Sequence, residues 1–370
     1  MSEMQEVPDR PLRHGYTTGA CATACTKAAL LTLLTHTPIS TVDIVLPIGE
    51  VVTFSMVRVD CKDDCAEAAT MKDAGDDPDA THGATIVASV SFTDGIGVEV
   101  DGGIGVGRVT KPGLPVPVGM AAINPIPRRM IVQAVNEVLE LHGMTRGVRV
   151  IISVPDGEEI AKKTLNARLG IIGGISILGT RGTVVPFSTS SYRASIIQGL
   201  RVAKEQGRTA VVLTTGGRSE KFAMRMYPEL AEDCFIEMGD FVGFSASQAK
   251  RLGFHDLRFV GMMGKFSKIA QGIMMVHSKS APVDFDFIAQ MAAEVGVKEE
   301  LLAQIRTANT ATQVGDWMLE WGYPQFFEQM SLYCCKRISE SMGGGTTIVT
   351  RLVTMGGVEL GGATFDGTES

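Results

Sequence analysis

The chain has 370 residues, of which 45% are apolar and 20% charged, a composition typical of a folded globular protein with room for two domains. Its net charge is −7, it has no run of five Lys or Arg, and it offers only 2 Trp and 5 Tyr for base stacking, which argues against long nucleic acid as a partner. The acidic N-terminus lacks an apolar core, and the apolar run 169–180 is too short to cross a membrane, so we expect a cytoplasmic protein with reduced thiols.

The first half of the chain predicts helices and a mainly antiparallel sheet. Apolar residues recur with helical spacing from Ala20 to His36, and a second helix is expected over 128–142. A further helix is expected over 157–170. The alternation of apolar and polar residues predicts strands over 41–50, 51–60, 84–92, 97–102, 148–154 and 174–180, the third and fourth as a pair.

The second half alternates strands with helices. Strands are expected over 209–215, 233–239, 257–264 and 345–357, the last of them closing the fold. Helices are expected between them, and the segment 284–342 looks mainly helical. This rhythm predicts a mainly parallel, doubly wound sheet. The fold class is therefore α/β and α+β, with an N-terminal α+β sheet-and-helix layer domain over 1–182 and a Rossmann-like domain over 183–370.

Common catalytic motifs are missing from the sequence. There is no Gly-x-Ser-x-Gly elbow, no phosphate-binding Gly-x-x-x-x-Gly-Lys-Ser/Thr loop and no His-Glu-x-x-His. The glycines of "GGIGVG" (102–107) precede "RVTKPGLP", which cannot open a helix, so a dinucleotide site is not expected there. Cys21 with Cys25 and Cys61 with Cys65 have a spacing that four zinc-binding thiolates would need, but it also fits buried core cysteines. We expect no protein-bound metal.

Glycine-rich turns follow three of the predicted parallel strands: "TTGGRSEK", "EMGDFVGFS" and "GMMGKFSK". Ligands of open parallel sheets bind outside the carboxyl ends of the strands, so these turns predict a ligand crevice. Glu237 and Asp240 come after a strand, where an acid often accepts ribose hydroxyls. Glycines that only shorten loops would give the same pattern.

The segment 181–280 is basic within an acidic chain, with 14 Lys or Arg against 8 Asp or Glu, a difference of +6. It is either a solvated helix face or a surface for an anionic partner. The turn Thr17–Thr18–Gly19 opens the first helix. One hydroxyl suffices for an ordinary cap, whereas two hydroxyls beside free N–H groups would also cradle an anion.

Six blocks of sequence occur in an order that resembles one known family. They are "GYTTGACATACTKAA", "GGIGVGRVTKPGLPVPVGMAAINPIPRRMI", "IIGGISILGTRG", "PFSTSSYRASI", "TTGGRSE" and "GMMGKFSKIAQG", between Leu12 and His277. Together they resemble the cobalt-precorrin-5B carbon-1 methyltransferases of anaerobic cobalamin biosynthesis. The resemblance implies methyl transfer from S-adenosylmethionine to carbon 1 of cobalt-precorrin-5B, giving cobalt-precorrin-6A, with the cobalt carried by the corrinoid substrate. The alternative is a non-catalytic corrinoid- or nucleotide-binding carrier or sensor.

The resemblance brings no assigned catalytic residue, so the site is predicted from the residue types. A proton acceptor, if one acts, is expected at His14 or Asp240. The predicted contacts of S-adenosylmethionine are Thr215, Gly216, Gly217, Glu237, Gly239, Gly261 and Gly264. The predicted contacts of the polyanionic corrinoid are Thr17, Thr18, Gly19, Arg181, Arg193, Arg218, Lys221, Lys265 and Lys268, because cations and helix N-termini bind carboxylates.

Overall fold

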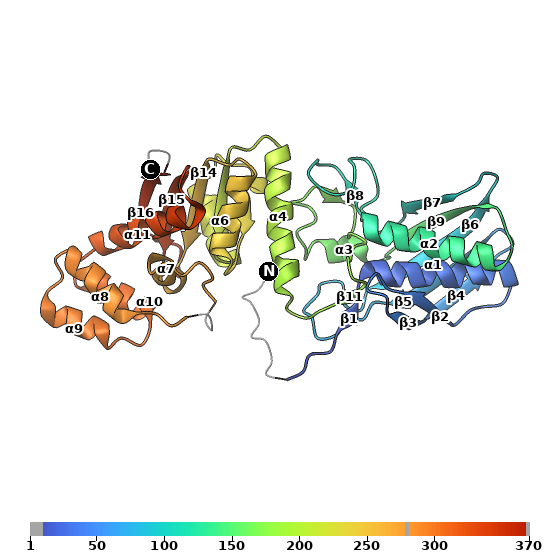
Figure 1. Cartoon of the computed structure of the whole chain (residues 1–370), viewed down its shortest axis with the longest axis horizontal. Coiled ribbons are helices and arrows are strands. Elements are labelled where there is room, and N and C mark those ends of the chain that lie inside the picture. Colours follow the sequence, from blue (N-terminus) through green and yellow to red (C-terminus); the bar gives the residue numbers. More distant parts are fainter. Residues whose placement is uncertain (1–9, 278–280, 368–370) are drawn as a thin grey trace. The chain divides into compact units, whose positions relative to one another are not determined.

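The computed structural model describes residues 10–277 and 281–367, so the first nine and the last three residues of the two expected domains lie outside it. The described residues divide into two compact units, unit 1 up to Ser188 and unit 2 from Thr189 onward (Figure 1). Both units combine helices with sheets, which confirms the mixed α/β class. The domain limits 1–182 and 183–370 stay a prediction.

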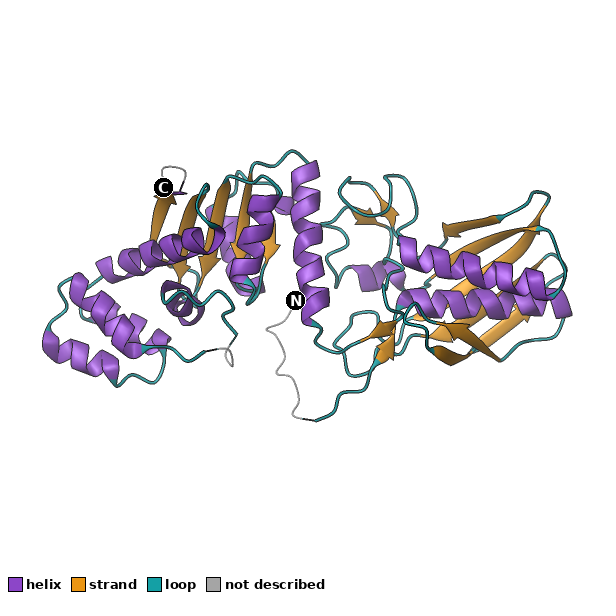
Figure 2. Cartoon of the chain, in the orientation of Figure 1, coloured by secondary structure: helices purple, strands orange, loops and turns teal. Residues whose placement is uncertain are grey.

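Unit 1 is built from two long helices packed on a five-stranded sheet (Figure 2). Helix α1 (Thr18–Thr35) lies beside α2 (Pro125–Leu141), and their apolar residues share one core with the sheet. The strands, in spatial order, are β4 (Arg58–Cys61), β5 (Cys65–Met71), β6 (Thr85–Thr93), β9 (Gly147–Ser153) and β7 (Val98–Gly102).

The sheet of unit 1 corrects two strand predictions. The segment 51–60 is not one strand: it breaks after β3 (Val51–Ser55), which forms a hairpin with β2 (Thr41–Val45), and resumes as β4 in the other sheet. β7 does not pair with β6. It lies parallel to β9 because β6 already has β5 and β9 as its two neighbours.

Small elements fill the rest of unit 1. They are β1 (Gly15–Tyr16) with β11 (Thr183–Val184), β8 (Arg108–Val109) with β10 (Ile171–Ile172), and α3 (Gly157–Ala161). The helix expected over 157–170 ends after one turn, because Thr164 and Asn166 bond to nearby backbone instead. The strand expected over 174–180 is also wrong: only isolated bridges at Ile175 and Ile177 form there, between glycine turns.

Unit 2 contains a second five-stranded sheet, whose first four strands are parallel. In spatial order these are β13 (Phe235–Glu237), β12 (Ala210–Thr214), β14 (Asp256–Gly261) and β15 (Thr347–Val353), with β16 (Glu359–Asp366) antiparallel at the edge. The sequence did not predict β16. Its Gly361 and Gly362 weaken a strand pattern, yet a Cβ at either position would collide with Phe327 or Arg351.

Helices accompany the strands of unit 2 as the alternating pattern predicted. Helix α4 (Thr189–Glu205) precedes β12. The next helices follow the strands in turn: α5 (Gly217–Met226) with the 3-10 turn η1 (Glu232–Cys234), α6 (Val242–Arg251) and α7 (Met263–Ala270). The later ones are α8 (Phe285–Glu294), α9 (Glu299–Arg306), α10 (Ala311–Glu320) and α11 (Gln325–Met342). Within the described ranges, no helix is both long and apolar enough to cross a bilayer.

Candidate functional site

The strand order of unit 2 fixes where a crevice can form. The chain runs from β12 to β13 on one side, then returns past β12 to β14 on the other. The connection after β12 therefore leads toward one edge of the sheet, and the connection after β14 leads toward the other edge. Open α/β sheets bind ligands between two such strands, outside their carboxyl ends. We call the turns at this end of the sheet the carboxyl edge. It consists of 214–217, 237–240, 261–265 and 353–357.

Lys265 joins three of these turns. Its Nζ donates a hydrogen bond to the carbonyl of Thr215 at 2.7 Å and lies 3.0 Å from Oδ1 of Asp240. The Asp240 side chain is only 3% exposed, whereas that of Lys265 is 34% exposed, so the carboxylate is shielded from water and the lysine partly faces it. The structure thus brings together Thr215, Asp240 and Lys265, which the sequence placed in three separate turns.

An acidic pair and a tyrosine lie at the end of β13. The Tyr192 hydroxyl donates to Oε1 of Glu237 at 3.4 Å. Burial, followed by the charge of Glu220, raises the pKa of Glu237, and burial also raises the pKa of Tyr192. The sequence did not single out Tyr192 or Glu220. Tyr192 was visible only as the neighbour of Arg193, and Glu220 only as one acid among cations.

The glycines of the carboxyl edge fall into two kinds. A Cβ on Gly261 would lie 2.3 Å from Phe266, and one on Gly239 would lie 2.7 Å from the Tyr192 hydroxyl, so these two glycines permit internal packing. A Cβ on Gly216 or Gly264 would meet nothing within 4 Å. These two positions face open space, where a ligand has room to approach the backbone.

Thr214 adds a buried polar atom at the same edge. It is the last residue of β12 and fully buried, and its Oγ1 has no hydrogen-bond partner. Buried hydroxyls normally have partners, because an unpaired one costs about 1–3 kcal/mol. Thr214 thus places an unsatisfied hydroxyl beneath the surface at the end of β12, as do Ser331 and Thr346 elsewhere in unit 2.

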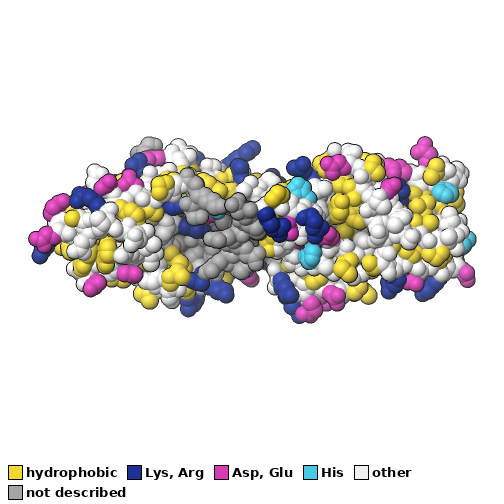
Figure 3. Space-filling model, turned by 90° about the horizontal axis from the view of Figure 1, so that it is seen from below, with side chains coloured by type: hydrophobic (Ala, Val, Ile, Leu, Met, Phe, Trp, Pro, Cys, Tyr) yellow, Lys and Arg dark blue, Asp and Glu magenta, His cyan; other side chains and the backbone are white. Residues whose placement is uncertain are grey.

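The predicted cations of unit 2 differ in availability. Arg193 is exposed and stacks over the Phe244 ring at 4.0 Å, and the exposed Arg218 contacts the sulfur of Met355, in the turn after β15, at 3.4 Å. Lys221 is also exposed. Lys268 points inward and donates to the carbonyl of His277. Figure 3 shows basic and acidic side chains interspersed on the face that it presents.

The start of α1 in unit 1 uses its polar groups internally. Thr17 caps the helix by accepting from Ala20 N at 3.2 Å. Thr18 Oγ1 accepts from Leu178 N at 2.9 Å and donates to the Leu178 carbonyl, which also accepts from Gly19 N. A Cβ on Gly19 would meet Pro127 at 2.6 Å. Contacts within unit 1 therefore explain why this turn has two threonine hydroxyls and a glycine, and no ligand is needed to explain them.

The other two predicted residues of unit 1 lie on its surface. His14 and Arg181 are both exposed, in the segments that flank the short β1–β11 pair. Their roles, like every ligand role proposed from the sequence, stay predictions.

The paired cysteines of α1 belong to the core. Burial raises the pKa of Cys21 to about 12 and that of Cys25 well above its ordinary value, so both thiols are neutral. Among the described residues, no three His, Cys, Asp or Glu side chains are grouped so as to hold a metal ion.

Comparisons with known proteins agree over most of the chain. A family model described as CbiD matches residues 5–186, and a model of the CbiD C-terminal domain matches residues 275–364. A Geobacillus sp. (strain WCH70) protein named cobalt-precorrin-5B C(1)-methyltransferase is 62% identical over 96% of this chain and 97% of its own. A Priestia megaterium protein of the same name is 56% identical over 98% of this chain and 100% of its own.

A solved structure is also similar to the chain. It is described as a cobalamin biosynthesis protein (cbiD) from Archaeoglobus fulgidus. It is 29% identical and covers 68% of this chain and 78% of its own, with a TM-score of 0.38.

Proposed function

The chain belongs to the CbiD family of cobalt-precorrin-5B C(1)-methyltransferases, and from this premise we propose that it binds its methyl donor, S-adenosylmethionine, at the carboxyl edge of unit 2. The chain is a methyltransferase of cobalamin biosynthesis, which confirms the family and activity expected from the six sequence blocks. The alternative of a non-catalytic carrier or sensor is set aside.

One observation carries the proposal: in the strand order β13-β12-β14-β15 the connections change side between β12 and β14, next to the open backbone at Gly216 and Gly264. We propose that this sheet is Rossmann-like and that the adenosine part lies over the end of β12. Gly216 and Gly264 leave the backbone open on either side of this change. The change of side between β12 and β14, the open glycines and the acid that ends β13 fit a nucleoside ligand.

Glu237 is the proposed partner of the ribose hydroxyls, because it is the last residue of β13 and an acid at the end of a strand binds the ribose in related sheet topologies. Tyr192 is a positioning residue that orients the Glu237 carboxylate. Asp240 is nearly buried, and its carboxylate is already paired with Lys265. We therefore assign Asp240 to positioning Lys265, and His14 stays the predicted base.

The corrinoid carries acetate and propionate side chains, so cations are needed to hold it. We propose that Arg193, Arg218 and Lys221 bind some of these carboxylates, since all three are exposed in unit 2. Arg193 is held by its ring contact with Phe244, and a stacked guanidinium still presents its edge to a carboxylate. Lys268 is unsuited to this role because its Nζ is buried.

S-adenosylmethionine supplies an electrophilic methyl group. The bond from this carbon to sulfur breaks as the bond to carbon 1 forms, and the sulfur keeps the electron pair, leaving S-adenosylhomocysteine. The protein's task is to align the two reactants, which is worth about 7–11 kcal/mol of barrier lowering in well-oriented reactions. The residues named above bind and orient, and none of them needs to form a covalent intermediate.

The replacement Glu237→Gln tests this proposal through pH. The raised pKa of Glu237 means that the native state holds its proton more tightly than the unfolded chain. Wild-type stability should therefore fall as pH rises from the ordinary Glu range through the raised pKa, and Glu237→Gln should remove that loss. The affinity for S-adenosylhomocysteine should fall in wild type as pH drops through the same window.

Denaturant unfolding at several pH values checks the change in stability, and calorimetric titration over the same pH range checks the change in affinity. At neutral pH we expect Glu237→Gln to bind S-adenosylhomocysteine about tenfold or more weakly, since hydrogen bonds to charged groups are worth about 1.5–3 kcal/mol. Affinity in the folded variant equal to wild type across the pH range would remove Glu237 from the donor site.

A further inference from the structure

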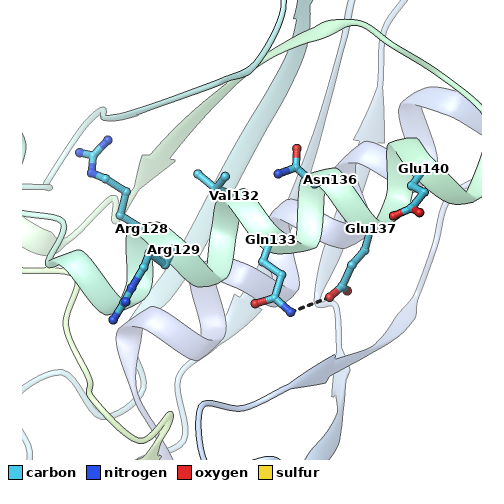
Figure 4. Close-up of a pocket in the computed structure, with 7 residues that line it drawn as sticks. All are labelled: Arg128, Arg129, Val132, Gln133, Asn136, Glu137 and Glu140. Carbon is cyan, nitrogen blue, oxygen red and sulfur yellow. Dashed lines mark hydrogen bonds between the residues drawn. The ribbon is translucent and has the colours of Figure 1, made fainter.

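The solvent-facing side of α2 forms a shallow hollow of about 600 Å³ (Figure 4). None of the residues predicted for the donor or the corrinoid lines it. Its lining residues are Arg128, Arg129, Val132, Gln133, Asn136, Glu137 and Glu140. In Figure 4 their side chains project from one stretch of the helix, with the arginines at one end and the glutamates at the other. We call this surface the α2 face.

The charges of the α2 face oppose the dipole of their own helix. A helix favours acids near its N-terminus and bases near its C-terminus, each by about 0.3–1 kcal/mol at an exposed site. The first turn of α2 has no acid and its last turn no base, while Arg128 and Arg129 lie near its start and Glu140 near its end. This order is unfavourable for an isolated helix. Arg128 is half-buried and donates to the carbonyl of Val100 at 2.7 Å inside unit 1, so Arg129 and the glutamates are the charges that a partner outside unit 1 would pair.

The charges also do not neutralise each other along α2. Residues four apart on a helix are neighbours, and the residue four after Arg129 is the uncharged Gln133. Gln133 donates to Oε1 of Glu137 at 2.8 Å, and Asn136 precedes Glu140 by the same spacing. At the spacing of four residues, both Arg129 and Glu140 thus have an amide as neighbour and not an opposite charge.

A second copy of α2, laid antiparallel across the first, would satisfy both ends. Arg129 and Glu140 are 11 positions apart, about 16 Å along the helix at 1.5 Å per residue. A two-fold axis near Gln133 and Asn136 places Arg129 of each copy opposite Glu137 and Glu140 of the other. The amides then meet at the centre. An isologous contact of this kind requires a self-complementary surface, and the α2 face is one.

Exposed apolar side chains extend the α2 face at both sides. Leu141, at the end of α2, is 80% exposed. Val45 lines a small hollow together with Gln133 and Glu137, and it pairs in register with Val51 of the neighbouring strand. These two valines are 52% and 66% exposed. The helix and the β2–β3 hairpin together offer the apolar area that a protein interface needs in addition to charge.

We propose that the α2 face is a homodimer interface, in which α2 packs antiparallel against α2 of a second copy of this chain. Arg129 pairs with Glu137 and Glu140 across a two-fold axis, and Val45, Val51 and Leu141 supply apolar contacts around them. The partner is a second copy of this chain, because an antiparallel copy of α2 places its acidic end opposite the basic end of the first α2, and the reverse.

Sedimentation velocity of the full-length protein over a concentration series tests this interface. Wild type should reach a dimer, and Arg129→Glu or Glu140→Arg should each weaken the dimer about tenfold or more. Each reversal replaces an attractive contact by a repulsive one twice per dimer, and exposed pairs are worth about 0.2–1 kcal/mol each. The double variant Arg129→Glu with Glu140→Arg should bind more tightly than either single variant, because it restores opposite charges between positions 129 and 140, while the unchanged Glu137 keeps it weaker than wild type.

The control is Lys62→Glu, a reversal of an exposed charge in the β4–β5 turn, which should leave the dimer unchanged. Circular dichroism and melting curves verify that every variant is folded. A wild-type protein that stays monomeric up to about 100 µM would overturn the proposal, since interfaces of standard size bind more tightly than that. So would a dimer indifferent to both single reversals, or a double variant no tighter than either single one.

Discussion

The start of α1 in unit 1 and the carboxyl edge of unit 2 carry the same sequence signal, but the structure uses the two differently. Both combine threonines with glycine at the beginning of a helix. At α1, Leu178 and the helix itself take up the hydroxyls of Thr17 and Thr18. At the end of β12, the Thr214 hydroxyl is unpartnered and Gly216 faces open space.

This difference shows what the signal means. Glycine and threonine before a helix indicate a close approach of backbone to something, but the sequence does not say whether that is another protein segment or a ligand. At α1 it is the segment at Leu178, 160 positions away in the sequence. At the carboxyl edge we propose that it is the methyl donor.

The largest effect is expected from Lys265→Met. This change leaves the nearly buried Asp240 carboxylate without its cation. Removing one partner of a buried pair costs about 3–5 kcal/mol, and the 34% exposure of Lys265 reduces this to about 2 kcal/mol. Chemical denaturation measures the loss, and binding of S-adenosylhomocysteine should weaken as well because the Thr215 turn loses its tie.

The matched control is Lys298→Met, which removes an exposed lysine at the start of α9 and should change neither quantity measurably. If Lys265→Met proves as stable as wild type and binds the ligand equally well, Lys265 does not organise the carboxyl edge.

A pair of glycine substitutions sharpens the comparison within unit 2. Gly261→Ala should cost about 1–3 kcal/mol of stability, because its methyl group would overlap the buried Phe266. Gly216→Ala meets no protein atom, so its stability should stay within about 0.5 kcal/mol of wild type. It should nevertheless weaken S-adenosylhomocysteine binding about tenfold or more, equal to about 1.4 kcal/mol.

Thermal melts and calorimetry on both variants separate packing glycines from ligand-facing ones. A Gly216→Ala protein with unchanged affinity would mean that the space beside this glycine is simply solvent.

The smallest effect on ligand binding and activity is expected from Thr18→Val in unit 1. Losing the hydroxyl bonds to Leu178 should lower stability by about 1–2 kcal/mol. Methyl-transfer activity per folded molecule should stay at the wild-type level, because the hydroxyl already has protein partners. A variant that keeps its stability but loses activity would restore the anion-cradle interpretation of this turn.

The parallel sheet of unit 2 was predictable because its strands are short, apolar and separated by helices, so their periodicity is clear. β16 was not, because Gly361 and Gly362 hide a strand whose glycines are required by packing. In unit 1, side-chain bonds of Thr164 and Asn166 ended a helix that the apolar spacing favoured.

The site residues, like the secondary structure, were predictable in part. Residues in turns after strands, such as Thr215, Asp240 and Lys265, came together because strand ends of a parallel sheet share one edge. Tyr192 and Glu220 were missed, since their closeness to Glu237 depends on how α4 and α5 pack. The inward turn of Lys268 was equally invisible, because the sequence gives a residue's type but not the direction of its side chain.

The most direct test of the account is a crystal structure of the protein with bound S-adenosylhomocysteine. We predict the adenosine over the end of β12, with its ribose hydroxyls within hydrogen-bond distance of the Glu237 carboxylate. Density for the ligand at the start of α1, or at any place away from the turns at 214–217 and 237–240, would contradict it.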